Sequence, residues 1–388
     1  MAAPAPIPSE QLATGDLLEE LRGRPEALAL FTLNVGDGDA QVVLLPTAEP
    51  DGGPRRAVVV DAYTRKTLDL LTVLTDAGLL AGGDDESDVA LVVATHPHHD
   101  HIGAMAPLLQ EFGTRVAEFW DPGYFHTIGA FHQMMREIEE RPDLLYSHPA
   151  SGLRRWIGRT AVTVLAPSIH LRNRFDTYGV ALNDSSISLR LDHPAARVTV
   201  RDDEGAVVEQ HARAASVVLG GDAQTLSWSY VLTDFPYLMR SNSPSAEAIA
   251  AATGDRDLLR AQVFKVSHHA SKRGVNLELL ERIRPQVTVI SCGPNSSRYH
   301  FPHDLAQEIL REARQPLAGS GSDRASKDWE LNIFYTSDTD TDGVALGTVV
   351  SVVEEGRRPQ VWRLGDDPPR EPRLSIAHLA DARRHVRG

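Results

Sequence analysis

The feature that most constrains this chain is an apolar strand pattern followed at once by a cluster of polar side chains. Residues 88–95 contain a near-continuous apolar run, which is typical of a strand covered on both faces by other elements. The next six residues read His-Pro-His-His-Asp-His. A histidine-rich surface turn is the ordinary alternative. The spacing H-x-H-x-D-H directly after a core strand favours a metal site instead.

The spacing within this segment assigns its side chains to two metal positions. In an extended or tightly turning chain, residues two apart point the same way, so we expect His96 and His98 to bind one ion. Asp100 and His101 then turn toward a second ion, whereas His99 is expected to point away. Imidazole and carboxylate groups are ligands that suit Zn²⁺, Mn²⁺ or Fe²⁺. We therefore expect two divalent metal ions per chain, Zn²⁺ or Mn²⁺.

The rest of the chain alternates between strand and helix patterns, as an α/β architecture requires. Strands are expected at residues 28–33, 40–45, 57–60, 161–165, 186–191, 216–219, 262–266, 287–291, 331–335 and 348–353. Helices are expected at residues 9–22, 67–80, 124–146, 245–252, 276–284 and 304–314. We divide the chain into a lead segment (1–27), one domain (28–365) with a helical insertion near the site (120–160), and a basic helical tail (366–388).

Composition bears on the compartment and on the partners of the chain. The formal charge of −14 argues against a broadly basic nucleic-acid-binding surface, although a local basic cleft is compatible with it. Cys292 is the only cysteine, so the chain forms no internal disulfide and nothing indicates an oxidising compartment. The N-terminus lacks a signal-peptide pattern, and no segment approaches the roughly 20 apolar residues that span a bilayer. We therefore expect a cytoplasmic protein without membrane association.

Several segments together resemble a known family. The H-x-H-x-D-H spacing matches the signature of the metallo-β-lactamase superfamily, and LNVGDGDA at residues 33–40 resembles a hairpin of its ComEC-like branch. Further similar segments follow in the order found in that branch: VDA at 60–62, VLAP at 164–167, NDSS at 183–186, LGGDA at 219–223 and KVSHHAS at 265–271. The ordered series is more specific than any one of its members.

The resemblance implies a four-layer αββα sandwich with the metal ions at one edge, between two sheets. It implies that Asp222 bridges the two ions and that one histidine of the pair His268 and His269 completes the second position. We favour His269 as the ligand and His268 as a group beside the substrate, a choice that the sequence leaves open. Asp61 is expected to orient a ligand histidine. The expected ligands are His96, His98, Asp100, His101, Asp222 and His269.

Two departures from the family pattern concern the substrate side of the site. No histidine in a matching context lies between the H-x-H-x-D-H segment and Asp222, so one ion is expected to keep an open position for water or substrate. Near the end of the domain, Phe301 replaces a histidine that relatives often carry, whereas His303 is retained. The expected catalytic groups are Asp100, His268 and His303. The expected substrate contacts are Lys272, Arg273, Asn295 and Tyr299.

The chemistry of a two-metal site indicates hydrolysis. Two cations lower the pKa of a water that bridges them toward about 7, which supplies hydroxide at neutral pH, and they neutralise charge that develops on the attacked group. The leading hypothesis is a phosphodiesterase or nuclease, because ComEC-like domains are tied to nucleic-acid processing. The runner-up is a hydrolase of a small carboxylic substrate such as a lactone, β-lactam or thioester. A third class is a non-catalytic, metal-stabilised scaffold that docks a protein partner through the basic tail.

Overall fold

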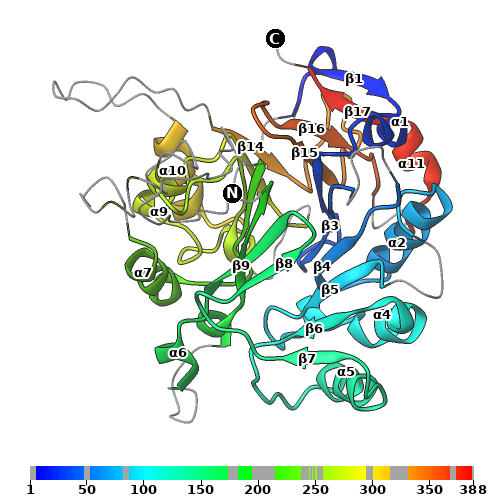
Figure 1. The fold of residues 1–388 in the computed structure, drawn as a ribbon. Coiled ribbons are helices and arrows are strands. Elements are labelled where there is room, and N and C mark those ends of the chain that lie inside the picture. Colours follow the sequence, from blue (N-terminus) through cyan, green and yellow to red (C-terminus); the bar gives the residue numbers. More distant parts are fainter. Residues whose placement is uncertain are drawn as a thin grey trace, which may run out of the picture.

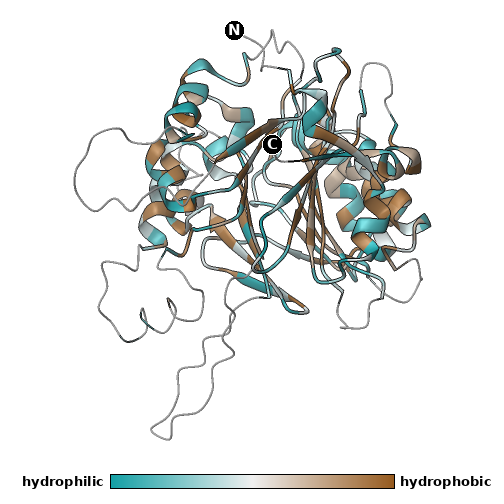
Figure 2. Ribbon diagram, turned by 90° about the horizontal axis from the view of Figure 1, so that it is seen from above, coloured by the Kyte–Doolittle hydropathy of each residue, from teal (hydrophilic) through white to brown (hydrophobic). Residues whose placement is uncertain are grey.

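The fold is a sandwich of two β-sheets with helices on both outer faces, seen in a computed structural model (Figure 1). The structure describes residues 6–47, 53–81, 87–173, 182–194, 215–236, 257–293, 300–314, 331–367 and 373–386, together with residues 244, 247 and 250. Seen from above, the apolar strands lie between two helical layers (Figure 2). The expected four-layer αββα architecture is therefore confirmed.

The larger sheet has ten strands and joins the two ends of the chain. Its order is β1 (Leu12–Gly15), β17 (Ala382–His385), β16 (Gln360–Arg363), β15 (Val349–Val353), β2 (Leu28–Thr32), β3 (Ala40–Leu44), β4 (Ala57–Ala62), β5 (Val89–Val93), β6 (Glu118–Trp120) and β7 (Leu145–Ser147). The strands from β4 to β7 are parallel, and the other pairs are antiparallel. Because β5 is buried along its whole length, its apolar run needs no alternation.

The smaller sheet has seven strands. Its order is β14 (Asn332–Tyr335), β13 (Val287–Ile290), β12 (Val263–Lys265), β11 (Ala215–Leu219), β10 (Ser188–His193), β9 (Thr160–Ala166) and β8 (Arg154–Ile157). The four strands from β11 to β14 are parallel, and the others are antiparallel. Most of these strands agree with the sequence prediction, because each is a short apolar run bounded by polar residues.

Helices cover the outer face of each sheet. Those over the larger sheet are α1 (Leu17–Arg22), α2 (Lys66–Asp76), α4 (Met105–Phe112), α5 (Gly129–Glu139) and α11 (Ile376–Ala380), as Figure 1 shows. Those over the smaller sheet are α7 (Thr225–Asp234), α9 (Leu277–Ile283) and α10 (Asp304–Arg314). The remaining helices are η1 (Ser9–Gln11), α3 (His99–Ile102), η2 (Gly113–Arg115), α6 (Ile169–Asn173), η3 (Leu182–Ser185) and η5 (Ser267–Ala270). No helix in the described part of the chain has both the length and the apolar character to cross a bilayer.

The central core lies between the two sheets and consists of aliphatic side chains from both inner faces. Leu30, Val58 and Leu91 from the larger sheet join Leu189 and Val217 from the smaller one in a single buried cluster. Burial of each such side chain contributes about 1.5–3 kcal/mol to stability. The two sheets are therefore held rigidly enough to position side chains at their shared edge.

The expected lead and tail segments take part in the larger sheet. Strands β1 and β17 pair with each other, and β17 also pairs with β16. Arg383 in β17 forms an ion pair with Asp340 at 2.8 Å, and the Arg384 guanidinium lies over the Trp362 ring. In the described part of the expected helical tail, the short helix α11 precedes a strand. Arg383 and Arg384 therefore contact neighbours within the same chain.

The expected helical insertion is only partly helical. Within residues 120–160, α5 is followed by β7 in the larger sheet and β8 in the smaller one. This stretch therefore passes from one sheet to the other. Of the expected helix 245–252, only residues 247 and 250 lie among the described residues, and both are helical.

Candidate metal centre

Four segments that are distant in the sequence meet at one edge of the two sheets. They are the end of β4, the turn after β5, the loop after β11 and the turn η5 after β12. Strands β4 and β5 are parallel, as are β11 and β12, so within each pair the carboxyl ends lie at the same edge. Loops at such an edge are held by a rigid scaffold and commonly carry the chemistry of α/β proteins.

Asp222 lies between two groups of histidines, and each of its carboxylate oxygens faces one group. Oδ2 is 3.6 Å from His96 Nε2, and Oδ1 is 3.4 Å from His101 Nε2. The Asp222 backbone N–H donates to Ser186 Oγ at 2.9 Å, which fixes the loop after β11. A carboxylate whose two oxygens face separate donor groups has the arrangement that a bridging ligand needs.

The first donor group consists of His96 and His98 together with Asp222. His96 Nε2 and His98 Nδ1 are 2.8 Å apart, so the two imidazoles direct these nitrogens at one point. His268 borders this group, because its Nε2 lies 3.6 Å from Asp222 Oδ2. The structure thus brings together the two histidines that the spacing pairs at one ion.

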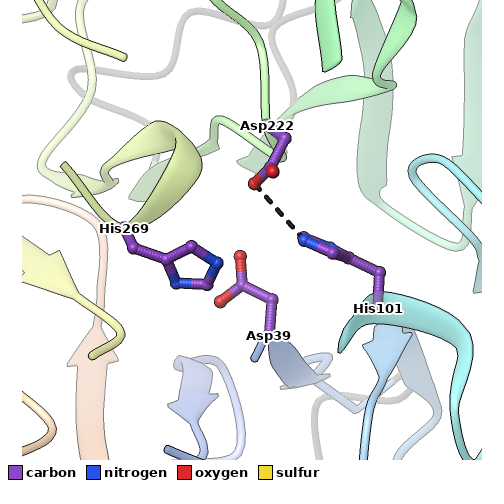
Figure 3. Close-up of side chains that lie close together, drawn as sticks. All are labelled: Asp39, His101, Asp222 and His269. Carbon is purple, nitrogen blue, oxygen red and sulfur yellow. Dashed lines mark ion pairs between the residues drawn. The ribbon is translucent and has the colours of Figure 1, made fainter. Parts of the chain in front are cut away.

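The second donor group consists of His101 and His269, again with Asp222. The Nδ1 of His101 donates to Asp61 Oδ2 at 2.7 Å, and the Nδ1 of His269 donates to the Ser291 carbonyl oxygen at 3.0 Å. Both Nε2 atoms are left buried, and within the described ranges neither they nor Asp222 Oδ1 has a hydrogen-bond partner. Figure 3 shows the His101, Asp222 and His269 side chains converging on a common centre.

The electrostatics of these groups suit metal binding. Burial acts to raise the pKa of Asp222, but His101 and neighbouring imidazoles hold it well below its usual value. Burial lowers the pKa of His96 well below its usual value and also lowers that of His269. For His101, burial acts to lower the pKa, but Asp222 and Asp61 raise it well above its usual value. Asp222, His96 and His269 are therefore in the forms that bind metals, whereas metal binding at His101 would release a proton.

The residues present fit divalent metal ions. Buried polar atoms almost always have a hydrogen-bond partner, yet in the described part of the chain His101 Nε2, His269 Nε2 and Asp222 Oδ1 have none. All three are borderline or hard donors of the kind that bind Zn²⁺ or Mn²⁺. An ion at their centre would satisfy all three at once.

Asp100, an expected ligand, lies at the rim of this arrangement, and His99 and His303 make contacts of their own. The Asp100 side chain is 44% exposed, and its Oδ2 lies 3.9 Å from His101 Nε2. His99 is exposed and contacts the Tyr63 ring edge-on, with ring centroids 5.8 Å apart. His303 Nδ1 accepts the backbone N–H of Leu305 at 3.2 Å, so this ring serves the start of α10.

Two of the four expected substrate contacts lie in the described part of the chain, and two lie outside it. Lys272 and Arg273 are exposed and follow η5 after Ser271. Asn295 and Tyr299 lie outside the described residues.

The turn η5, which carries the histidine pair, has a strained backbone. His268, His269 and Ala270 have φ angles of 49°, 52° and 58°, a left-handed conformation that costs non-glycine residues of order 1–3 kcal/mol each. The turn is held by a hydrogen bond from the His268 N–H to the Gly221 carbonyl oxygen at 2.9 Å. The Phe301 ring packs against both histidines, with centroids 5.3 Å and 5.2 Å away. The residue that replaces the family histidine therefore supports the turn.

Asp39 is a candidate ligand that the sequence pattern does not identify, because the pattern predicts only the end of a hairpin turn at this position. Asp39, His101, Asp222 and His269 each offer one donor atom, and these atoms all lie within 4.8 Å of one another. The available signal was strand register. Ala40 pairs with Ala62, which places the residue before β3 beside the strand end that carries Asp61.

Comparisons with known proteins find partial similarities. Residues 51–198 match the family model of the metallo-beta-lactamase superfamily. A stretch of 53 residues, 14% of this chain, is 38% identical to ComE operon protein 3 of Bacillus subtilis (strain 168), and it spans 7% of that protein. Among solved structures, the chain is similar to the metallo-beta-lactamase fold protein YhfI from Bacillus subtilis, with 10% identity, 79% of this chain and 96% of that chain covered, and a TM-score of 0.38. It is also similar to a long form RNase Z from yeast, with 9% identity, coverages of 81% and 40%, and a TM-score of 0.40.

The two stacked sheets and the donor groups at their edge define an α/β protein with a candidate metal centre. The family match specifies the class further for part of the chain: residues 51–198 are similar to the metallo-β-lactamase superfamily, whose members are generally metal-dependent hydrolases. The short match to ComE operon protein 3 supports the resemblance to the ComEC-like branch.

Proposed function

We propose that this chain is a two-metal phosphodiesterase that uses Zn²⁺ or Mn²⁺. The observation that carries the proposal is the position of Asp222, whose two oxygens face His96 and His101 at 3.6 Å and 3.4 Å. With His98 on one side and His269 on the other, each oxygen belongs to a separate donor group. Bound at these positions, two divalent ions supply an activated water and neutralise charge on a phosphoryl group.

The chain itself fixes the donor groups before any ion binds. Asp61 and the Ser291 carbonyl oxygen accept from the Nδ1 atoms of His101 and His269. These contacts set the tautomers in which both Nε2 atoms face the site. Such preorganisation removes the need to reorient ligands during the reaction.

His268 is placed to contact the substrate. Gln224 Nε2 donates to His268 Nδ1 at 3.0 Å, and Asn183 Nδ2 lies 3.3 Å from both ring nitrogens. With Nδ1 as the acceptor, the ring proton is on Nε2, the atom that faces Asp222. The side chain is partly exposed, unlike that of His269. We propose that His268 donates from Nε2 to an oxygen of the bound phosphoryl group.

The charge distribution favours a phosphodiester that reaches a local cationic rim. The chain has a formal charge of −14, so an anionic substrate is not drawn to the protein as a whole. Lys272 and Arg273 are exposed immediately beyond the turn that carries His268. These two cations offer the local positive charge that a phosphodiester, or a single nucleic-acid strand, requires.

Three substrates test this proposal on metal-loaded protein: bis-p-nitrophenyl phosphate, labelled single-stranded DNA and a neutral lactone. We expect the two phosphodiesters to be cleaved and Asp222→Ala to abolish that cleavage. Cleavage of the lactone with both phosphodiesters intact would overturn the proposal in favour of a small carboxylic substrate. Tight metal binding without cleavage of any of the three would favour a scaffold role.

A further inference from the structure

Asp39 lies in the second donor group although it comes from the hairpin between β2 and β3. One of its carboxylate oxygens lies within 4.8 Å of the donor atoms of His101, Asp222 and His269. Figure 3 shows the Asp39 carboxylate directed between the other three side chains. Asp39 is fully buried, so its carboxylate has no access to bulk water.

The hairpin backbone holds Asp39 at this position. The Asp39 N–H donates to the Asp100 carbonyl oxygen at 2.9 Å, and the Asp39 carbonyl oxygen accepts the Tyr63 N–H at 3.2 Å. The close approach depends on Gly38, because a Cβ there would lie 2.1 Å from the Tyr63 ring and 2.7 Å from the Asp100 carbonyl oxygen. The hairpin is thus joined to the turn that carries His101.

Two hydrogen bonds orient the Asp39 carboxylate without using all of its lone pairs. Gln41 Nε2 donates to Oδ1 at 3.0 Å, and the Lys265 ammonium donates to Oδ2. A carboxylate has about four lone-pair positions. Asp39 can therefore keep both contacts and still bind an ion.

The buried charges at this position are incompletely balanced by the chain. The buried, described residues here include the carboxylates of Asp39, Asp61 and Asp222 and one ammonium group, that of Lys265, which pairs with Asp39. Once His101 has released its proton to allow an ion to bind, three negative charges against one positive charge leave two negative charges. Uncompensated buried charge is costly, and a divalent ion supplies the two missing positive charges.

We propose that Asp39 is a ligand of the second metal position, together with His101, Asp222 and His269. The inference rests on the proposed two-metal function. In this inference, the hairpin completes a metal site between the two sheets. The Lys265–Asp39 ion pair links the hairpin to β12. Lys265 is a positioning residue here, because it acts through Asp39.

Metal titration of the metal-free protein tests the inference apart from activity. Zn²⁺ affinity at each position is measured by competition with a chromogenic chelator in wild type and in Asp39→Asn. We expect wild type to bind two ions, and Asp39→Asn to bind one of them at least about 100-fold more weakly, since loss of even an outer partner costs about 10–100-fold. Asp338→Asn is the matched control, because Asp338 is also buried and paired with a buried cation, Arg363, at 3.0 Å. Its metal affinities should equal those of wild type.

A second measurement on the wild-type chain does not depend on how the variants fold. In a crystal structure of the Zn²⁺-loaded protein, an Asp39 oxygen about 2.0–2.2 Å from an ion would support the inference. An Asp39 carboxylate beyond bonding distance, or an Asp39→Asn titration identical to wild type with two ions bound, would overturn this inference alone. A wild-type chain that binds no ion would overturn the proposed function as well.

Discussion

Asp61 Oδ2 accepts a hydrogen bond from His101 Nδ1 at 2.7 Å, and both side chains are fully buried. The same carboxylate accepts the backbone N–H and the hydroxyl of Thr95, both at 2.8 Å. One aspartate at the end of β4 therefore fixes both the start of the turn after β5 and the orientation of a donor imidazole. Its own backbone is in the left-handed region, with φ at 60°, which directs the side chain toward the neighbouring strand end.

This relationship predicts that Asp61→Asn weakens metal binding without removing a ligand. The amide nitrogen would replace one acceptor, so either Thr95 or His101 loses its partner. We expect Zn²⁺ affinity at one position to fall by about 10–100-fold, as is usual for groups that orient metal-binding histidines. Chelator competition measures the loss, and an unchanged affinity would show that His101 is oriented by other contacts.

The role of Asp222 predicts a larger effect on both ions. Because its two oxygens face different donor groups, Asp222→Ala should lose most of one ion and weaken the other. Metal analysis of purified protein gives the stoichiometry, with thermal unfolding of the metal-free forms as a check that the variant folds. Two fully retained ions in the variant would remove Asp222 from the ligand set.

The histidine pair of η5 predicts two separable phenotypes. His269 is fully buried with an unpartnered Nε2 among the described residues, whereas His268 is 19% exposed and accepts from Gln224. We therefore expect His269→Ala to lower metal content, and His268→Ala to keep the metal and lose turnover of bis-p-nitrophenyl phosphate. Metal analysis beside steady-state kinetics distinguishes the two variants. The reverse pattern would exchange the two roles.

The sequence predicts the central strands well but not the edges of the larger sheet. Strands such as β5 and β11 are buried runs of aliphatic residues, so local pattern is sufficient. Strands β1 and β17 are short and mostly half-buried, and their pairing joins opposite ends of the chain. In the sequence, the basic residues of β17 have the pattern of a solvated tail. Their contacts with Asp340 and Trp362 are visible only in the structure.

The candidate site, too, can be predicted from the sequence only in part. His96, His98 and His101 occur within one short motif, which makes their proximity a local property of the sequence. Asp39 meets Lys265 across 226 residues, and this contact depends on how the two sheets stack. Strand register places Asp39 at the correct edge, but only the packed structure shows that its carboxylate enters a donor group.

A buried ion pair away from the donor groups gives a prediction on stability. Lys66 Nζ lies 2.7 Å from Asp366 Oδ2, and both side chains are buried. Asp366 also accepts the N–H of Thr348 at 2.6 Å. Asp366→Ala leaves the Lys66 ammonium buried without its carboxylate, although it still donates to the Asn34 carbonyl oxygen at 3.2 Å. The loss of the counter-charge should lower the free energy of unfolding by about 3–5 kcal/mol.

Urea unfolding of the metal-free protein measures this loss. The double variant Lys66→Met/Asp366→Asn removes both charges and should recover a large part of it, because no charge is then left buried alone. A loss below about 0.5 kcal/mol for Asp366→Ala, as is usual for surface substitutions, would mean that Lys66 reaches water or another acceptor.

The last prediction separates substrate classes by charge. Lys272 and Arg273 are exposed beyond η5, and a phosphodiester is anionic while a lactone is neutral. We expect Lys272→Ala or Arg273→Ala to raise KM for a phosphodiester by about two- to five-fold, since exposed charge pairs contribute about 0.2–1 kcal/mol. Metal content should stay unchanged. For labelled single-stranded DNA, KM should also depend less steeply on salt in the variants. A protein that makes fewer phosphate contacts releases fewer counterions when it binds the strand.

Arg159→Ala provides the matched control for this experiment. Arg159 is also an exposed cation, with 53% of its side chain accessible, and it lies in the turn between β8 and β9. The site lies near the other end of β9. Ala166 at that end pairs with Ser188, and Ser188 donates to the Gly220 carbonyl oxygen beside the Asp222 loop. Arg159 is therefore at the end of β9 away from the site. Equal effects of Arg159→Ala and Lys272→Ala would indicate a general charge effect. An effect confined to Lys272 and Arg273 would place the phosphodiester beside η5, where His268 can reach it.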